Sequence, residues 1–178
     1  TFGVVYSWQD TRVIIDVSVV RGTTLKTSIL GLLDRLEPKR IILVSSAPQI
    51  RYPDCYGIDM YKLGDFAAFR EAIALHKERG NEAIISQIYE KAKLELEKPS
   101  SEQVNVVKEL YDSLEVIDIS NKIAEMVKPK NVRFEFDILF QSIENLHQAC
   151  PNDLGDWYFT GDYPTAGGTA VANRSYVY

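Results

Sequence analysis

The sequence has few of the residues from which disulfide frameworks and metal clusters are built. Cysteine occurs only twice, at Cys55 and Cys150, which is too few for a disulfide framework and is typical of the reducing cytosol. Histidine also occurs twice, and neither histidine has a cysteine or carboxylate at a metal-ligand spacing. No apolar run approaches the ~20 residues of a membrane span. We therefore expect a cytoplasmic location, no membrane contact and no signal peptide.

Positive charge is also scarce. The 20 Lys and Arg residues are outnumbered by 25 Asp and Glu residues, and the net charge of −5 argues against nucleic-acid binding. An anionic substrate is still possible, because one loop and one metal ion can reverse the local field. With 178 residues, 46% of them hydrophobic, the chain can bury a real core. The sequence starts at Thr1 rather than Met, and we expect a piece of a longer protein.

The most informative pattern lies in residues 12–24. The β-branched run from Val13 to Ile15 predicts a strand buried on both faces, and this strand ends at Asp16. A turn containing Gly22 follows, and then a predicted helix over about residues 24–36. Its expected apolar face consists of Leu25, Ile29, Leu32, Leu33 and Leu36. A strand, a turn and a helix N-terminus form a layout that can hold a phosphorylated sugar.

A second apolar run predicts another strand over residues 40–45. Strand, helix and strand in this order form a right-handed βαβ unit, which implies a parallel sheet and the α/β class. Ligands of such sheets bind at the carboxyl ends of the strands. Asp16 and the pair Ser45 and Ser46 follow neighbouring strands, so we expect them to face one crevice.

The remainder of the chain is predicted to be mainly helical. Helices are predicted over residues 66–79, 82–97, 102–114 and 119–127, while residues 134–140 fit either a strand or a helix and 138–148 favour a helix. We divide the chain into a core at 1–63, a helical region at 64–149 and an irregular tail at 150–178. Within the tail, residues 165–169 predict a flexible loop. The aromatic side chains there are expected to dock on a neighbouring domain: Trp157, Tyr158, Phe159 and Tyr163.

The residues of this pattern resemble a known family. Asp-x-Ser-x-Val-Arg-Gly-Thr-Thr at 16–24 is similar to the phosphoribosyl pyrophosphate (PRPP) loop of type I phosphoribosyltransferases, and its ending resembles the amidophosphoribosyltransferases. Ser-Ser-Ala-Pro-Gln-Ile-Arg-Tyr-Pro at 45–53 and Tyr-Gly-Ile-Asp-Met at 56–60 are also similar to that family. Phe-Thr-Gly-Asp-Tyr-Pro at 159–164 is a weaker match.

The resemblance implies part of a type I phosphoribosyltransferase core followed by a helical C-terminal region. The implied PRPP-binding residues are Asp16, Ser18, Val19, Val20, Arg21, Gly22, Thr23 and Thr24. It also implies Mg²⁺ at Asp16 and an active-site loop that contains Ser45, Ser46 and Arg51.

The implied reaction is the first step of purine synthesis, in which ammonia from glutamine is transferred to PRPP to give 5-phosphoribosylamine. An N-terminal glutaminase domain outside these residues would supply the ammonia, and the fragment alone would be inactive. Enzymes of this family are homo-oligomers inhibited by purine nucleotides, and we carry both properties as expectations.

Two departures from the family pattern matter. The family loop begins with two acidic residues, but Val17 follows Asp16 here, and a lost charge-assisted hydrogen bond costs about 1.5–3 kcal/mol of binding. Some family members hold an iron–sulfur cluster through cysteines at places that Asp54, Asn152 and Gly155 occupy in this chain. We therefore expect no iron–sulfur cluster.

Three alternatives remain open. A non-catalytic phosphoribosyl- or nucleotide-binding module is favoured by Val17. A phosphoribosyltransferase acting on a purine or pyrimidine base is less consistent with the blocks at 45–53 and 56–60. A simple α/β interaction domain is the third. An N-terminal cysteine directly after the initiator Met of the complete reading frame would favour the amidotransferase.

Overall fold

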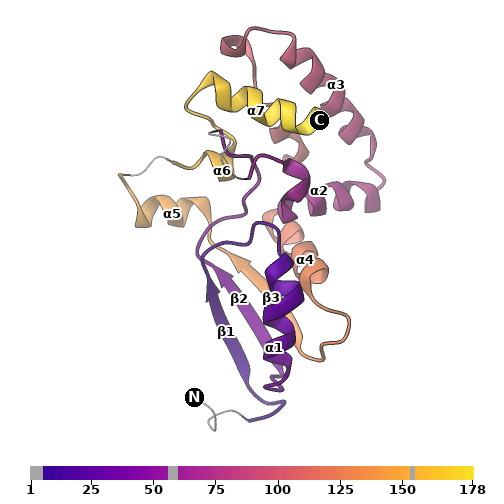
Figure 1. Cartoon of the computed structure of the whole chain (residues 1–178), viewed down its shortest axis with the longest axis vertical. Coiled ribbons are helices and arrows are strands. Elements are labelled where there is room, and N and C mark those ends of the chain that lie inside the picture. Colours follow the sequence, from indigo (N-terminus) through magenta and orange to yellow (C-terminus); the bar gives the residue numbers. More distant parts are fainter. Residues whose placement is uncertain (1–5, 56–59, 153–154) are drawn as a thin grey trace.

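A parallel sheet forms the centre of the core. The computed structural model describes residues 6–55, 60–152 and 155–178 (Figure 1). Three strands pair in the order β1 (Thr11–Asp16), β2 (Arg40–Ser45) and β3 (Glu135–Phe140), all parallel. Asp16 lies beside Ser45, which lies beside Phe140, so the carboxyl ends of all three strands share one edge. The predicted α/β class is confirmed.

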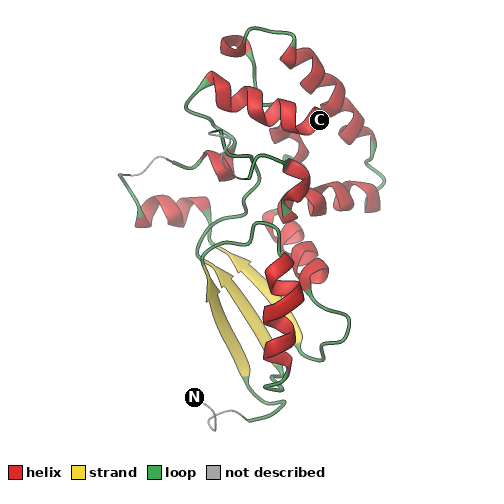
Figure 2. Ribbon diagram, viewed as in Figure 1, coloured by secondary structure: helices red, strands yellow, loops and turns green. Residues whose placement is uncertain are grey.

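Helices make up most of the remaining chain (Figure 2). Between β1 and β2 lie the π-helical turn η1 (Leu25–Ile29) and α1 (Leu30–Asp34). Between β2 and β3 lie η2 (Leu63–Asp65), α2 (Ala67–Glu78), α3 (Ala83–Leu96), η3 (Ser100–Glu102), η4 (Val106–Leu110) and α4 (Val116–Val127). After β3 come α5 (Ile143–Ala149), α6 (Trp157–Thr160) and α7 (Ala166–Val177). Within the described ranges, no helix has the length and apolar content that crossing a membrane requires.

The helices α2 and α3 confirm two predictions, and three other segments differ from theirs. The helix predicted at 102–114 is wrong: η4 is a short 3₁₀ turn, whose preceding Asn105 accepts a hydrogen bond from the Val107 N–H. This bond caps the start of η4 at Val106, so residues 103–105 lie outside the turn. The helix favoured over 138–148 begins only at Ile143, because residues 135–140, which fitted either a strand or a helix, form β3 and pair with β2 in the core sheet. The α4 helix begins at Val116, before its predicted start.

The tail is helical and packs on this chain. The prediction of an irregular segment with a loop at 165–169 is wrong, because α7 begins at Ala166 and its N-cap, Thr165, accepts from the Gly168 N–H. Gly168 lies directly against the Tyr163 ring, and a Cβ at this position would clash with that ring. The aromatic side chains of Tyr158, Phe159 and Tyr163 are partly buried and pack against the chain's own core. Their docking on a neighbouring domain stays a prediction.

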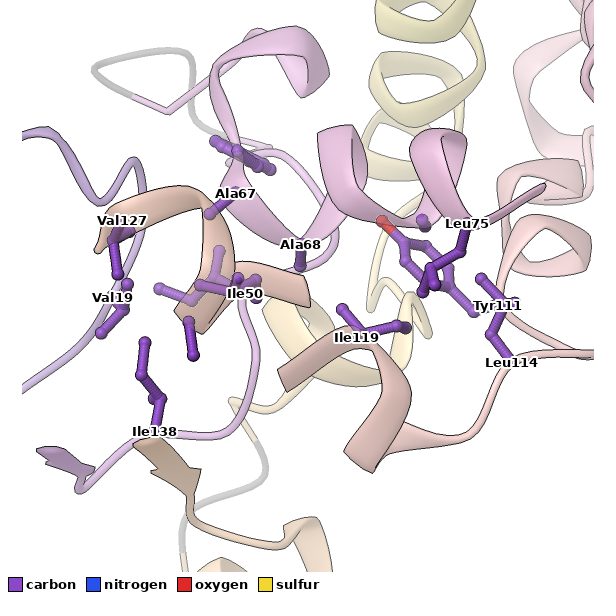
Figure 3. Close-up of a cluster of buried hydrophobic side chains, with 14 of the residues drawn as sticks. Val19, Ile50, Ala67, Ala68, Leu75, Tyr111, Leu114, Ile119, Val127 and Ile138 are labelled. Atoms are coloured by element: carbon purple, nitrogen blue, oxygen red, sulfur yellow. The ribbon is translucent and has the colours of Figure 1, made fainter. Parts of the chain in front are cut away.

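One face of the sheet is buried under helices. Ile14, Leu43 and Ile138 belong to this face by register and contribute to the core. Figure 3 shows part of that core, in which Val19 of the loop after β1 and Val127 of α4 belong to the same cluster. The loop that follows β1 is therefore anchored in the core through the side chain of Val19.

The opposite face of β1 is exposed among the described residues. Val13 is 63% exposed and Ile15 is 78% exposed, so the prediction of burial on both faces is wrong. The described helices cover only the other side. Leu32, predicted to face the core, is also exposed, because η1 is π-helical and moves the buried position to Leu30.

This asymmetry predicts a large difference between two isoleucines on opposite faces of adjacent strands. Ile41→Ala should lower the free energy of unfolding by about 2–5 kcal/mol, because Ile41 is fully buried and the change leaves a cavity. Ile15→Ala should change it by less than about 1 kcal/mol. Urea unfolding followed by circular dichroism measures both values. Equal losses would mean that the exposed face of β1 is covered in solution.

Candidate functional site

A cavity opens where β1 ends and the following loop begins. Its volume is about 410 Å³. The lining residues are Asp16, Ser18, Val19, Val20, Arg21, Gly22, Thr23, Thr24, Leu25, Ile29 and Met60. All eight residues that the resemblance assigns to PRPP are thus brought together around one space, while Val17 is not part of the lining.

The second half of the loop is held by the start of α2. The Ala67 N–H donates to the Val20 carbonyl at 2.8 Å, and an Arg70 guanidinium N–H donates to the Arg21 carbonyl at 2.9 Å. In a trans peptide the N–H points opposite to the carbonyl of the same peptide unit. The N–H groups of Arg21 and Gly22 therefore point away from α2. Both residues line the cavity, so these amides are suitably placed donors for an anion.

Gly22 has a steric reason to be glycine. Its φ is +73°, in the left-handed region that favours glycine, and a Cβ there would lie 2.5 Å from Cγ1 of Val127. Val127 is fully buried in α4. The loop can follow its path only because position 22 has no side chain between it and α4.

The two threonines at the start of the helix are both exposed. Thr24 is the N-cap residue of η1, but its side chain makes no capping hydrogen bond. The carbonyl of Thr23 accepts a bond from the Thr27 hydroxyl at 2.9 Å. Thr24 therefore does not cap the helix through its side chain, and it is one of the residues that line the cavity.

The charges around the cavity come mainly from Asp16 and Arg21. Oδ1 of Asp16 accepts from the Val17 N–H at 2.8 Å, which turns the carboxylate back over the strand end. Arg21 forms an ion pair with Asp65 at 3.4 Å, and both side chains are about half exposed. Asp65 belongs to η2, so this pair joins the loop to the segment before α2.

The predicted loop residues Ser45, Ser46 and Arg51 are not among the lining residues. Ser45 is buried and donates to the Ala47 carbonyl at 2.8 Å, while Ser46 donates to the Val17 carbonyl at 3.1 Å. Arg51 donates to Oε1 of Gln49 at 2.9 Å, and its guanidinium lies 4.9 Å from the Tyr111 ring centroid. The two serines therefore hydrogen-bond to the backbone near the strand ends, and the Arg51 guanidinium packs against Gln49 and the Tyr111 ring.

Some residues of the site were missed from sequence. Met60 lines the cavity; it ends the family-like block at 56–60, of which residues 56–59 lie outside the described residues. Arg70 holds the loop from α2, but no sequence pattern connects an arginine so far along the chain with residue 21. Leu25 and Ile29 complete the lining and could have been found from their place in the predicted helix.

The donor set fits a magnesium ion only as part of a substrate complex. Across the described residues, no three His, Cys, Asp or Glu side chains gather in a metal-binding group. Mg²⁺ commonly binds through one or two carboxylates together with water and substrate phosphates. Asp16 can supply one such carboxylate, and the exposed Val17 cannot supply a second.

Asp54 occupies the position that is cysteine in cluster-bearing members of the resembled family, and its side chain is held by a tyrosine. Oδ1 of Asp54 accepts a hydrogen bond from the Tyr158 hydroxyl at 3.2 Å. Neighbouring Cys55 is half-buried, and burial raises the pKa of its thiol. A cysteine with a raised pKa forms the metal-binding thiolate less readily.

Comparison with known proteins identifies partial relatives. No family model matches the chain, and no solved structure matches it significantly. The amidophosphoribosyltransferases of Pasteurella multocida and Escherichia coli strain K12 are 37% and 36% identical over 75 residues, which is 42% of this chain. The enzyme of Pseudomonas aeruginosa is 45% identical over 47 residues, or 26% of this chain and 9% of that enzyme. The matches to the first two relatives span only 15% of their length. The chain therefore has partial similarity to amidophosphoribosyltransferases, the family that the loop residues resemble.

Proposed function

We propose that this chain is part of an amidophosphoribosyltransferase and that its loop cavity binds the phosphoribosyl group of PRPP. The observation that supports this best is the lining of the cavity, to which every loop residue from Ser18 to Thr24 contributes. The cavity also lies at the carboxyl end of a parallel strand, where α/β proteins bind ligands. Partial similarity to amidophosphoribosyltransferases supports the same assignment.

In the proposed reaction, the nitrogen of ammonia attacks C1 of the ribose. The bond between C1 and the pyrophosphate oxygen breaks with its electron pair, and the attacking nitrogen loses one proton to solvent, giving 5-phosphoribosylamine and pyrophosphate. The amides of Arg21 and Gly22 and the hydroxyls of Thr23 and Thr24 would donate to the 5′-phosphate. Asp16 would accept hydrogen bonds from the ribose hydroxyls or hold Mg²⁺. Mg²⁺ bound together with the substrate would neutralise the negative charge of the departing pyrophosphate.

The remaining parts of the activity are proposals about the parent protein. Because the matched stretch is a small fraction of the relatives, a glutaminase domain in the rest of the parent would release the ammonia. We also propose a cytoplasmic homo-oligomer that responds to purine nucleotides.

Calorimetric titration of PRPP into the 178-residue chain, with and without Mg²⁺, tests the proposed site. We expect binding with Mg²⁺, weakened about ten- to a hundredfold by Thr24→Val, since a hydrogen bond to a charged group contributes about 1.5–3 kcal/mol. The free energy of unfolding should not change, because Thr24 makes no capping bond. Thr11→Val, at the other end of β1, is the matched control. Folded protein that ignores PRPP, or a Thr24→Val variant that binds as well as the parent, would contradict the assignment.

A second candidate is a phosphoribosyl-binding module without catalysis. Val17 favours it, because the strand end then carries one carboxylate where the resembled family has two. The two candidates predict different outcomes when the complete parent protein is given PRPP and ammonia. Release of pyrophosphate from PRPP in the presence of ammonia supports the transferase, whereas tight binding without release supports the module.

A further inference from the structure

The loop after β2 is held by hydroxyl groups of three tyrosines, which we call the tyrosine clamp: Tyr111, Tyr158 and Tyr163. Tyr111 donates to the Arg51 carbonyl at 3.1 Å, and Tyr163 donates to the Pro53 carbonyl at 2.7 Å. Tyr158 donates to Oδ1 of Asp54 at 3.2 Å. Two of the three come from the C-terminal segment 157–163, far from the loop in sequence.

The backbone of the same segment also binds the loop. The carbonyl of Tyr158 accepts from the N–H groups of Arg51 at 2.9 Å and Tyr52 at 3.1 Å. Gly161 has a φ of +75°, and a Cβ there would lie 2.8 Å from Cζ of Tyr52. Segment 157–163 therefore follows the loop closely, and position 161 must be glycine for this contact to form.

The hydroxyls of the tyrosine clamp stay protonated. Tyr111 is buried, Tyr158 and Tyr163 are half-buried, and the Asp54 carboxylate that Tyr158 holds belongs to a residue that is 7% exposed. Burial raises the pKa of Tyr111 and of Tyr163, and burial together with Asp54 raises the pKa of Tyr158. Their hydroxyls therefore remain hydrogen-bond donors at neutral pH. A buried carboxylate held by such a donor is fixed in orientation.

A short path leads from the clamp to the cavity. The backbone N–H of Asp54 donates to the carbonyl of Met60 at 2.9 Å. Met60 lines the cavity, and its φ of +54° is a conformation that a non-glycine residue adopts only when its surroundings hold it there. Asp54 thus contacts the C-terminal segment through its side chain and the cavity wall through its backbone.

We propose that Tyr158 and Asp54 are positioning residues: by joining segment 157–163 to Met60, they fix the side wall of the loop cavity. The expected effect on ligand binding rests on the proposed phosphoribosyl site. The hydrogen bonds that join Tyr158, Asp54 and Met60 do not depend on that proposal. It assigns a role in the site to a segment that is not among the residues lining the cavity. Without the Tyr158 hydroxyl, the carbonyl of Met60 should lose its fixed position and ligand binding should weaken.

The two methionines of the chain provide a direct test. Met60 lines the cavity, and Cε of Met126 would lie 3.5 Å from a Cβ at Gly22, on the α4 side of the loop. Protein labelled with ¹³C at the methionine methyl groups should give two NMR signals, which Met126→Leu assigns. In ligand-free protein, Tyr158→Phe should shift the Met60 signal and leave the Met126 signal in place. Tyr178→Phe, at an exposed ring, is the control and should shift neither.

Titration with ribose 5-phosphate separates the two proposals. Tyr158→Phe should weaken its binding by about threefold to tenfold, the range of coupling through a bonded network. If ribose 5-phosphate shifts neither methyl signal in the parent, the proposed function fails, while the ligand-free comparison still decides the positioning role. If Tyr158→Phe folds and leaves the Met60 signal unshifted, the positioning role is overturned. Should Tyr158→Phe fail to fold, Asp54→Ala, which loses the same side-chain bond but keeps the backbone N–H that donates to Met60, replaces it with the same two expectations.

Discussion

Gly22→Ala should lower the free energy of unfolding by about 2–4 kcal/mol and remove PRPP binding. A left-handed backbone at a non-glycine residue costs about 1–3 kcal/mol, and overpacking of a core costs a similar amount. Both penalties apply at Gly22, because its φ is +73° and the new methyl group would meet buried Val127 at 2.5 Å. Relief of the contact would displace the loop from α4, and with it the amides that face the cavity.

Two other glycines of the chain separate these penalties. Gly80 has a φ of +69° but open space around its Cβ position, so Gly80→Ala should show the backbone cost alone. Gly31 lies within α1, with open space and an ordinary φ, and Gly31→Ala should stabilise by up to about 1 kcal/mol. Urea unfolding gives the three free energies, and calorimetry gives PRPP affinity. If Gly22→Ala costs no more than Gly80→Ala, the loop is not pressed against α4 in solution.

The start of the sheet and the loop were predictable because their signals are local. A β-branched run, a following acid and a glycine-containing turn identify β1 and its loop within a few neighbouring residues, and the spacing to the next apolar run identifies β2. Gathering of the loop residues around one cavity follows from this connectivity. The placement of Asp16 beside Ser45 is likewise a consequence of parallel pairing.

The remainder depends on contacts between distant residues. Residues 134–140 have a pattern that fits a strand or a helix, and pairing with β2 decides between them. The glycine-containing start of α7 has weak helical preference, but packing against Tyr163 overrides it. For Arg51, the sequence shows a cation near the site, whereas Gln49 and the distant Tyr111 determine where its charge lies.

The exposed face of β1 illustrates the same limit. A continuous apolar run is typical of a strand covered on both sides, and residues 13–15 have that composition. Whether a second layer is present depends on other polypeptide segments, which the run itself does not identify. Within the described residues, the helices cover only the face of Ile14, so Val13 and Ile15 contact solvent.

Val17→Asp should tighten PRPP binding in the presence of Mg²⁺ by about ten- to a hundredfold, which corresponds to about 1.5–3 kcal/mol for a regained charge-assisted interaction. The expected gain depends on the ion. A second carboxylate beside Asp16 attracts Mg²⁺ carried by the pyrophosphate, but without Mg²⁺ it repels the phosphates. Affinity should therefore rise with Mg²⁺ and stay equal or fall in the presence of a chelator. Val17 is 76% exposed, so the free energy of unfolding should change by less than about 0.5 kcal/mol.

Asp16→Ala completes this test from the opposite direction. Loss of the carboxylate that lines the cavity should remove Mg²⁺-dependent binding in the Val17 background. In the Asp16→Ala, Val17→Asp double variant, recovery of part of the affinity would mean that the two positions share one ion. If Val17→Asp alone does not change PRPP affinity in the presence of Mg²⁺, the side chain at position 17 does not lie close to the bound pyrophosphate. Asp16 would then act on the ribose, and the ion would have no role in binding at this strand end.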